Sequence, residues 1–139
     1  MSLLRAESVC IFSSMQGKLT FNGEPASGAK ITRKVTWKGK KEETDSTSAG
    51  DNGEFTFEVM NRELKRFFPA EFVAYQKIIV DYQGEQYLIW EMAKRETSEF
   101  GELGGKLVNF RCELTNEPDG ADVPRGLLLT SCKWDGIEK

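Results

Sequence analysis

Apolar and polar residues alternate in short runs along most of this chain, and turn-forming residues separate the runs. The alternation is clearest over residues 29–37, whose apolar positions share one face: Ile31, Val35 and Trp37. Arg33 is the single charged residue on that face. A period of two is typical of strands with one buried side, so the pattern predicts a β-protein.

Turn signals and further alternation organise the strands into hairpins. Residues 73–82 and 85–92 form the strongest predicted hairpin, turned at Gln83-Gly84, and we expect it to be central. Residues 42–48 lack apolar side chains, which suits the edge of a sheet. We predict a single domain over residues 1–139, an antiparallel β-sandwich of seven to eight strands.

One stretch departs from the strand period. Residues 61–68 begin with a possible helix cap, Asn61, and have apolar residues at i, i+3 and i+4: Leu64, Phe67 and Phe68. Pro69 ends the pattern, which predicts one short helix. Residues 1–7, expected to be flexible or a cloning leader, and residues 135–139, expected to be a flexible tail, flank the domain.

Charge and composition exclude several partners. The chain has 19 basic and 22 acidic residues, interspersed, and a net charge of -3, so no basic surface for nucleic acid is expected. No apolar run approaches the roughly 18 residues of a membrane helix.

Two long loops are predicted. Residues 94–106 form a charged loop that contains glycines, and long loops of this kind often carry functional residues. Residues 116–125 are expected to be a second loop.

The cysteines bear on the compartment. Cys112 and Cys132 each lie in a predicted strand, and a bridge between them would close a loop of about 20 residues. Such a bridge would imply an oxidising compartment, whereas two buried free thiols would suit a cytosolic domain. We expect a periplasmic or cell-envelope protein if the pair is bridged, and a cytoplasmic one if it is reduced.

A family resemblance supports the fold. The spacing Gly17-x-Leu19-x-x-x-Gly23-x-Pro25-x-x-Gly28-Ala29-x-Ile31, followed by Asp51-x-Gly53-x-Phe55-x-Phe57, resembles the opening of carboxypeptidase regulatory-like domains. These domains share the transthyretin-like (prealbumin-like) sandwich, which implies Greek-key topology. Residues 82–87 and 101–106, with the paired cysteines, are similar to a group of small uncharacterised bacterial proteins carrying this domain. The resemblance implies binding rather than chemistry.

The absence of histidine argues against catalysis. The chain has no histidine, which removes Ser-His and Cys-His nucleophiles and histidine metal sites. It also excludes hydroxyisourate hydrolase activity, known from enzymes of the transthyretin-like fold, whose C-terminal Tyr-Arg-Gly-Ser is replaced here by residues 131–134. We expect a protein that is not an enzyme, with no metal and no cofactor.

Candidate residues for partner binding come from the predicted strand over residues 29–37 and from the long loop over residues 94–106. They are Arg33, Trp37, Lys94, Arg95, Phe100 and Glu102. Arg33 serves either as an anion or partner anchor, or as a packed arginine whose head pairs with a nearby carboxylate. Phe100, surrounded by charged residues, is the kind of side chain that a partner covers.

The favoured hypothesis is a non-catalytic module that binds an unknown protein partner. A concrete form of it is an immunity or accessory protein of a bacterial secretion system. The alternative is a structural or small-ligand-binding envelope protein, with weak self-association through an edge strand. A third hypothesis, an enzyme using lysine, arginine and carboxylates, requires a cleft with converging polar groups.

Overall fold

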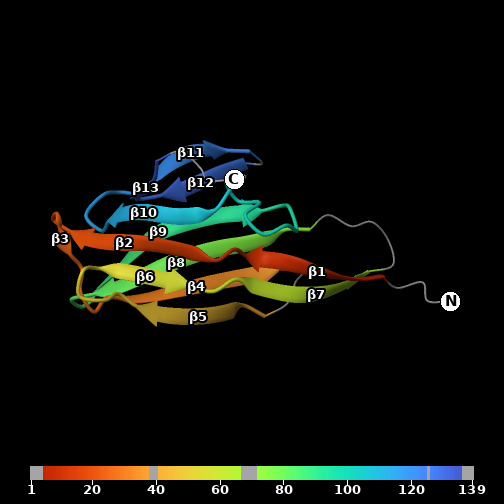
Figure 1. The fold of residues 1–139 in the computed structure, drawn as a ribbon, viewed down its shortest axis with the longest axis horizontal. Helices are drawn as coiled ribbons and strands as arrows, with labels where there is room; N and C mark the ends of the chain where they lie inside the picture. Colours follow the sequence, from red (N-terminus) through yellow and green to blue (C-terminus); the bar gives the residue numbers. More distant parts are fainter. Residues whose placement is uncertain (1–4, 38–40, 67–71, 125, 136–139) are drawn as a thin grey trace.

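The computed structural model describes residues 5–37, 41–66, 72–124 and 126–135, which form strands and turns with no helix (Figure 1). In chain order the strands are β1 (Arg5–Phe12), β2 (Met15–Phe21), β3 (Glu24–Pro25), β4 (Lys30–Trp37), β5 (Glu43–Ser48), β6 (Glu54–Phe57), β7 (Met60–Arg66), β8 (Ala74–Tyr82), β9 (Glu85–Lys94), β10 (Leu107–Glu113), β11 (Asp119–Val123), β12 (Gly126–Thr130) and β13 (Cys132–Lys133). The prediction of an all-β fold is confirmed. The described residues hold 13 strands rather than seven or eight.

Six strands form one antiparallel sheet in the order β11-β12-β9-β8-β4-β5. The β8–β9 hairpin lies at its centre and turns at Gln83 and Gly84, both with positive φ, as the sequence predicts. The polar strand β5 lies at one edge, also as predicted. Along β4, buried residues alternate with partly exposed ones, and Arg33 lies on the buried side.

A second layer faces this sheet. It contains a five-stranded sheet in the order β13-β10-β2-β3, with β6 also paired to β2, and the two-stranded sheet of β1 and β7. Strand β10 runs parallel to β2, with Phe110 opposite Gly17, whereas the other pairs are antiparallel. A parallel pair needs a long connection, and here most of the chain lies between the two strands.

Aromatic rings join the two layers into one core. Trp90 on β9 lies with its ring centroid 6.0 Å from Phe12 on β1 and 5.9 Å from Phe110 on β10. Phe21 on β2 approaches the Tyr82 ring of the central hairpin at 5.5 Å. Because these contacts cross from one layer to the other, the arrangement is sandwich-like.

The disulfide between Cys112 and Cys132 is present, so the pairing of these cysteines is confirmed. Both residues are buried, and they lie opposite each other where β13 pairs with β10. The bond fixes the chain end to the parallel β2–β10 pair. The third cysteine, Cys10, is free and buried.

The predicted helix over residues 61–68 is wrong. Residues 60–66 form β7, which pairs antiparallel with β1 from Cys10↔Asn61 to Arg5↔Arg66. Met60 and Leu64 are buried while Asn61 and Glu63 are exposed, so the period is two. Pairing with β1 satisfies the backbone and overrides the local helical spacing. Residues 67–69 of that prediction lie outside the described residues.

Two boundary expectations also change. Residues 5–7, expected to belong to a flexible start, pair with β7 as part of β1. The expected loop over residues 116–125 contains strand β11, which pairs along its length with β12. Of the expected flexible tail, residues 136–139 lie outside the described residues.

Candidate functional site

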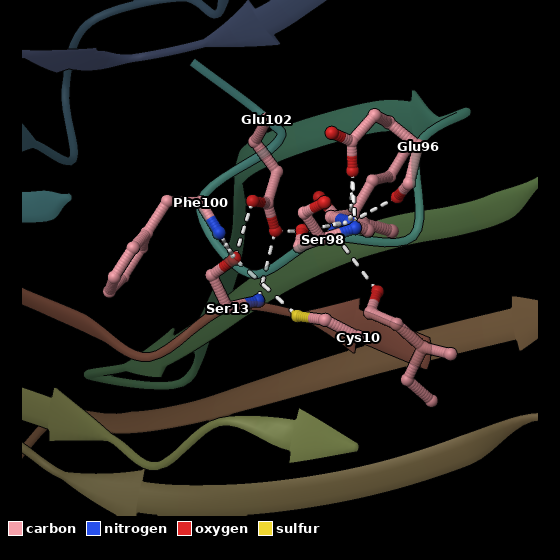
Figure 2. A network of polar contacts seen from close by, with 9 residues as sticks. Cys10, Ser13, Glu96, Ser98, Phe100 and Glu102 are labelled. Carbon is pink, nitrogen blue, oxygen red and sulfur yellow. Dashed lines mark hydrogen bonds and ion pairs between the residues drawn. The ribbon is translucent and has the colours of Figure 1, made fainter. Parts of the chain in front are cut away.

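A buried carboxylate, Glu102, is the centre of a polar network beneath the loop that follows β9 (Figure 2). Its Oε2 accepts hydrogen bonds from the Ser13 backbone N–H and from Gln76 Nε2, each at 2.9 Å. Its Oε1 accepts a 2.6 Å bond from the Ser13 hydroxyl. All three residues are fully buried. The carboxylate therefore ties the β1–β2 junction and strand β8 to the loop.

Gln76 extends this network into the core. Its Nε2 also donates to the Ile11 carbonyl at 3.1 Å, and its Oε1 accepts a 2.9 Å bond from Trp90 Nε1. Gln76 lies on the inward face of β8, next to apolar positions, yet its amide is well satisfied. The network thus contributes a specific arrangement of partners to an otherwise apolar core.

Cys10 borders the network from β1. Its Sγ lies 3.5 Å from the Ser13 hydroxyl oxygen, and its backbone N–H donates to the Thr97 carbonyl at 2.8 Å. Burial raises the pKa of the Cys10 thiol, and the hydrogen bond with Ser13, which acts in the opposite direction, does not reverse the shift. The thiol is therefore protonated at neutral pH, the opposite of what a nucleophilic cysteine needs.

A buried lysine holds the beginning of the same loop. Lys94, the last residue of β9, donates from Nζ to the carbonyl oxygens of Glu96 and Ser98, the latter at 2.7 Å. Its Nζ lies 5.9 Å from the centroid of the Phe72 ring. The loop therefore folds around the ammonium group, and its backbone carbonyl groups take the place of water as hydrogen-bond acceptors.

Arg33 is buried in a similar way between the layers. Its Nε and Nη2 donate to the two carboxylate oxygens of Asp45, at 2.9 and 2.6 Å. Its guanidinium also donates to the carbonyl oxygens of Ser13, at 3.0 Å, and Glu58, at 2.5 Å. Two aromatic rings flank it, with centroids 4.8 and 4.3 Å away: Phe12 and Phe57. Of the two interpretations drawn from the sequence, Arg33 therefore fits the packed arginine whose head pairs with a nearby carboxylate.

Four of the six residues predicted to bind a partner are buried, so the prediction is corrected for them: Arg33, Trp37, Lys94 and Glu102. Their polar groups are satisfied internally, and Trp37 Nε1 likewise donates to Glu43 at 2.7 Å. In this conformation they cannot touch another protein. Arg95 is exposed and Phe100 is half-buried, with its ring pointing away from the network in Figure 2. Their contact with a partner stays a prediction.

The outer face of the six-stranded sheet has an apolar patch that sequence reasoning missed. Tyr75 and Leu127 are the exposed large hydrophobic residues, with 58% and 60% of their surface accessible. Tyr75 on β8 pairs in register with Ala93 on β9. Leu127 on β12 directly precedes Leu128, which pairs with Met92, the residue before Ala93. We call the apolar residues of this face the outer-sheet patch: Tyr75, Ile79, Leu88, Ala93, Leu127 and Leu129.

A polar depression lies on the opposite surface, over the five-stranded sheet. Its volume is about 580 Å³, and its lining includes residues of β2, β6 and β10: Gln16, Lys18, Thr56, Asn109 and Arg111. Arg111 is bound to Asp135 at 3.3 Å. Glu54 also lines the depression, so its charged residues are of both signs.

The residues that the structure describes include neither a metal-binding cluster nor a membrane-spanning helix. That part of the chain contains no group of three or more Cys, Asp or Glu side chains arranged to hold a metal ion. None of its elements is a helix long and apolar enough to cross a membrane.

Some of these residues leave a signal in the sequence and others leave none. Gln76 is a polar residue at an inward position of an alternating strand, the same signal that marked Arg33. Leu127 belongs to three consecutive leucines, where an alternating strand has polar residues between. Ser13 has no signal of its own, because its role depends on Glu102, 89 residues away.

Comparison with known proteins gives one match. A family described as a domain of unknown function, DUF6795, matches residues 15–117, from the start of β2 into the turn after β10. Searches among curated proteins and among solved structures found no match. The matched range covers most of the two sheets, together with Gln76, Lys94 and Glu102. The chain therefore belongs to the DUF6795 family.

Proposed function

We propose that this chain is a non-catalytic module that binds another protein. The observation that carries the proposal is the outer-sheet patch, with Tyr75 and Leu127 both more than half exposed on one sheet face. The register puts these two residues two strands apart, about 10 Å, so one partner covers both. Clustered apolar and aromatic surface marks protein interaction sites.

The rest of the patch supports the same proposal. Ile79 and Leu88 pair in register at the end of the patch nearer the β8–β9 turn, and both are half-buried. The ion pair between Lys77 and Glu91, 3.6 Å apart, crosses the patch and adds polar groups that a partner can recognise. A mixture of apolar anchors and a few charges is typical of specific interfaces.

The surroundings of the reactive side chains do not favour chemistry. Ser13 and Glu102 are closed off from solvent, and their hydrogen-bonding groups are used within the protein. Lys94 is held by backbone carbonyls. The resemblance to carboxypeptidase regulatory-like domains, among which carriers and accessory modules occur, points the same way.

The disulfide supports an oxidising compartment. Buried disulfides persist in oxidising environments, so the Cys112–Cys132 bond supports a periplasmic or envelope location. An immunity or accessory protein of a bacterial secretion system fits a small acidic domain of this kind. The partner's identity then follows from capture in the organism that makes the protein.

Affinity capture with matched variants tests the proposal. The wild type and an Arg95→Ala/Phe100→Ala variant of the loop are compared with a Tyr75→Ser/Leu127→Ser variant of the patch. A Glu85→Ser/Gln86→Ser variant on the exposed hairpin end is the control. We expect the control to retain the partner and the patch variant to lose at least about tenfold in affinity. Equal capture by all variants, or no specific capture, contradicts the proposal.

The polar depression of about 580 Å³ on the five-stranded sheet favours a second function, small-ligand binding in the envelope. Its volume lies within the range of ligand sites. Lys18 in its lining suits an anionic ligand, while Arg111 is paired with Asp135 and Glu54 adds a second carboxylate. A thermal-shift screen of anionic metabolites tests this: stabilisation lost in Lys18→Ala supports it, and no stabilisation by any of them contradicts it.

A further inference from the structure

Strand β11 forms the end of the six-stranded sheet, at the upper rim of the molecule in Figure 1. It pairs on one side with β12, from Asp119↔Thr130 to Val123↔Gly126. Within the described part of the chain, no strand pairs with its other side. β11 therefore offers a row of backbone groups to an additional strand.

The backbone N–H groups that face the open edge can be assigned to residues. The Gly120 backbone N–H donates to the Asp119 carboxylate at 2.9 Å, so it is not used in the ladder with β12 and faces the open edge. Backbone groups alternate in direction along a strand, so the N–H of Asp122 faces the same edge. An added strand therefore forms its hydrogen bonds at Asp122, and at Gly120 it must first displace the Asp119 carboxylate.

An exposed apolar side chain lies beside these groups. Leu127 is 60% exposed, and a Cβ atom placed on Gly120 would lie 3.3 Å from its Cδ1. The leucine therefore leans over Gly120 toward the open edge, because that residue has no side chain. A strand added to β11 would cover Leu127, which no described part of the chain covers fully.

The sandwich is also open on the inner side of this edge. A groove of about 180 Å³ lies between β11 and β13, and its lining includes Ala121, Lys133 and Trp134. Strand β13 pairs with β10 over two residues only, so it leaves the groove uncovered. Side chains of an added strand that point inward enter this groove.

On the opposite side of the sandwich the two layers are joined at the end of β5. There β5 leads directly into β6, and the Gly50 backbone N–H bonds to the Glu54 carbonyl at 2.9 Å. Arg33 spans the two layers, from Asp45 on β5 to the carbonyl of Glu58. Among the described residues β5 also lacks a strand on its outer side, so the choice of β11 rests on its exposed leucine neighbour, its groove and its charge.

Charge identifies the occupant. β11 contains Asp119 and Asp122, both exposed, and Glu117 precedes it. Lys133 is the cation in the groove lining, so the edge as a whole is acidic. Pairing two β11 edges from two copies would bring like charges together, which is unfavourable. A strand with basic residues is complementary.

We propose that β11 is the docking edge for an extended, basic segment of a partner protein, which adds to the sheet as a further strand and covers Leu127. The inference rests on the proposed protein-binding function and specifies the mode of contact. Main-chain hydrogen bonds to Gly120 and Asp122 supply affinity, and the acidic edge favours partner segments with basic residues.

The probe is an acetylated, amidated peptide of eight residues in which Lys and Val alternate, titrated into the full chain labelled with ¹⁵N. We expect binding at low salt, with slowed amide exchange at Gly120 and Asp122 and none at Ser46 on the other edge. The same peptide N-methylated at alternate residues should not bind. A Glu-Val peptide should bind at least about tenfold more weakly.

Two substitutions at one position separate backbone from charge. Asp122→Pro removes the edge-facing N–H, and Asp122→Asn removes only the charge. We expect Asp122→Pro to bind the Lys-Val peptide at least about tenfold more weakly than Asp122→Asn does. Equal binding by the two variants overturns the proposal, as does protection at β5. So does absence of binding up to about 1 mM peptide.

The remaining outcomes separate this inference from the proposed function. If Asp122→Pro fails to fold, the N-methylated peptide still tests the edge on the wild type. Self-association of the wild type through β11, measured by sedimentation, identifies a second copy as the occupant and overturns the proposal. If capture of the partner depends on Tyr75 and Leu127 but not on Asp122→Pro, the edge inference fails while the function stands.

Discussion

The hydroxyl of Ser13 donates a 2.6 Å hydrogen bond to Glu102, 89 residues later in the chain, where solvent is excluded. The same hydroxyl accepts a 2.6 Å bond from the Phe100 backbone N–H. Residues of the β1–β2 junction therefore hold the loop after β9 from its buried side. The loop is rich in charged residues, and it folds around two of them that are buried, Lys94 and Glu102.

Replacing Glu102 tests the structural role of this network. Glu102→Ala leaves the Ser13 N–H and the Gln76 amide without their acceptor in a buried site, so we expect a loss of about 3 kcal/mol in the free energy of unfolding. Urea denaturation measures it. Glu99→Ala is the control, because Glu99 is exposed and bonds only loosely to Ser14, at 3.3 Å; a change within about 0.5 kcal/mol is expected there. Equal effects of the two variants would show that the network contributes little.

Replacing Arg33 by lysine tests the ion pair between the layers. Lysine keeps the charge but cannot form the two-pronged contact with Asp45 and also reach the Glu58 carbonyl. We expect Arg33→Lys to destabilise by about 3 kcal/mol. Lys34→Arg, on the neighbouring outward position of β4, should change stability by less than about 0.5 kcal/mol. A neutral Arg33→Lys would contradict the account of the buried guanidinium.

The sequence was sufficient where a local pattern and the fold agree. The alternation of β4, the Gln83-Gly84 turn and the polar edge strand β5 each follow from short-range rules. Residues 61–66 show the reverse case, because their helical spacing is overridden by pairing with β1, a segment about 50 residues earlier.

The candidate site was harder to predict because it depends on distant contacts. Arg33 was singled out as a charged residue on an apolar strand face and Glu102 as a member of a charged loop, and both are buried in the structure. Tyr75 was missed because an aromatic residue in a strand indicates core packing as readily as an interface. Its exposure is set by the sheet face on which it lies, which the alternation alone does not orient.

The disulfide gives a prediction about redox conditions. Reduction opens a bond between residues 20 positions apart, which should lower the free energy of unfolding by about 3 kcal/mol. Reduced wild type and the Cys112→Ser/Cys132→Ser variant should then unfold at similar urea concentrations. Thiol counting after unfolding should give one thiol without reductant and three with it. Three thiols in protein isolated from its own cells would place the domain in a reducing compartment.

Glu113 gives a prediction about acid stability. Partial burial pushes its pKa upward, but hydrogen bonds from Thr115 and from the Gly23 and Asn22 amides outweigh this and lower the pKa from 4.5 to about 2. Because the folded pKa is depressed, the carboxylate contributes stability above pH 4.5, and this contribution is lost as pH falls toward 2. Unfolding curves of the wild type and Glu113→Gln should therefore differ at pH 6 and converge near pH 2. A constant difference across this range would contradict the assignment.

Site-specific photo-crosslinking in the organism that makes the protein tests the binding function most directly. A photoreactive phenylalanine analogue replaces Leu127 or Tyr75 on the outer-sheet patch, or Gln86 on the exposed hairpin end as a control. The account expects one partner protein to be cross-linked from positions 127 and 75 and not from position 86. Absence of a cross-linked protein, or equal cross-linking from all three positions, would contradict the claim that this face binds a partner.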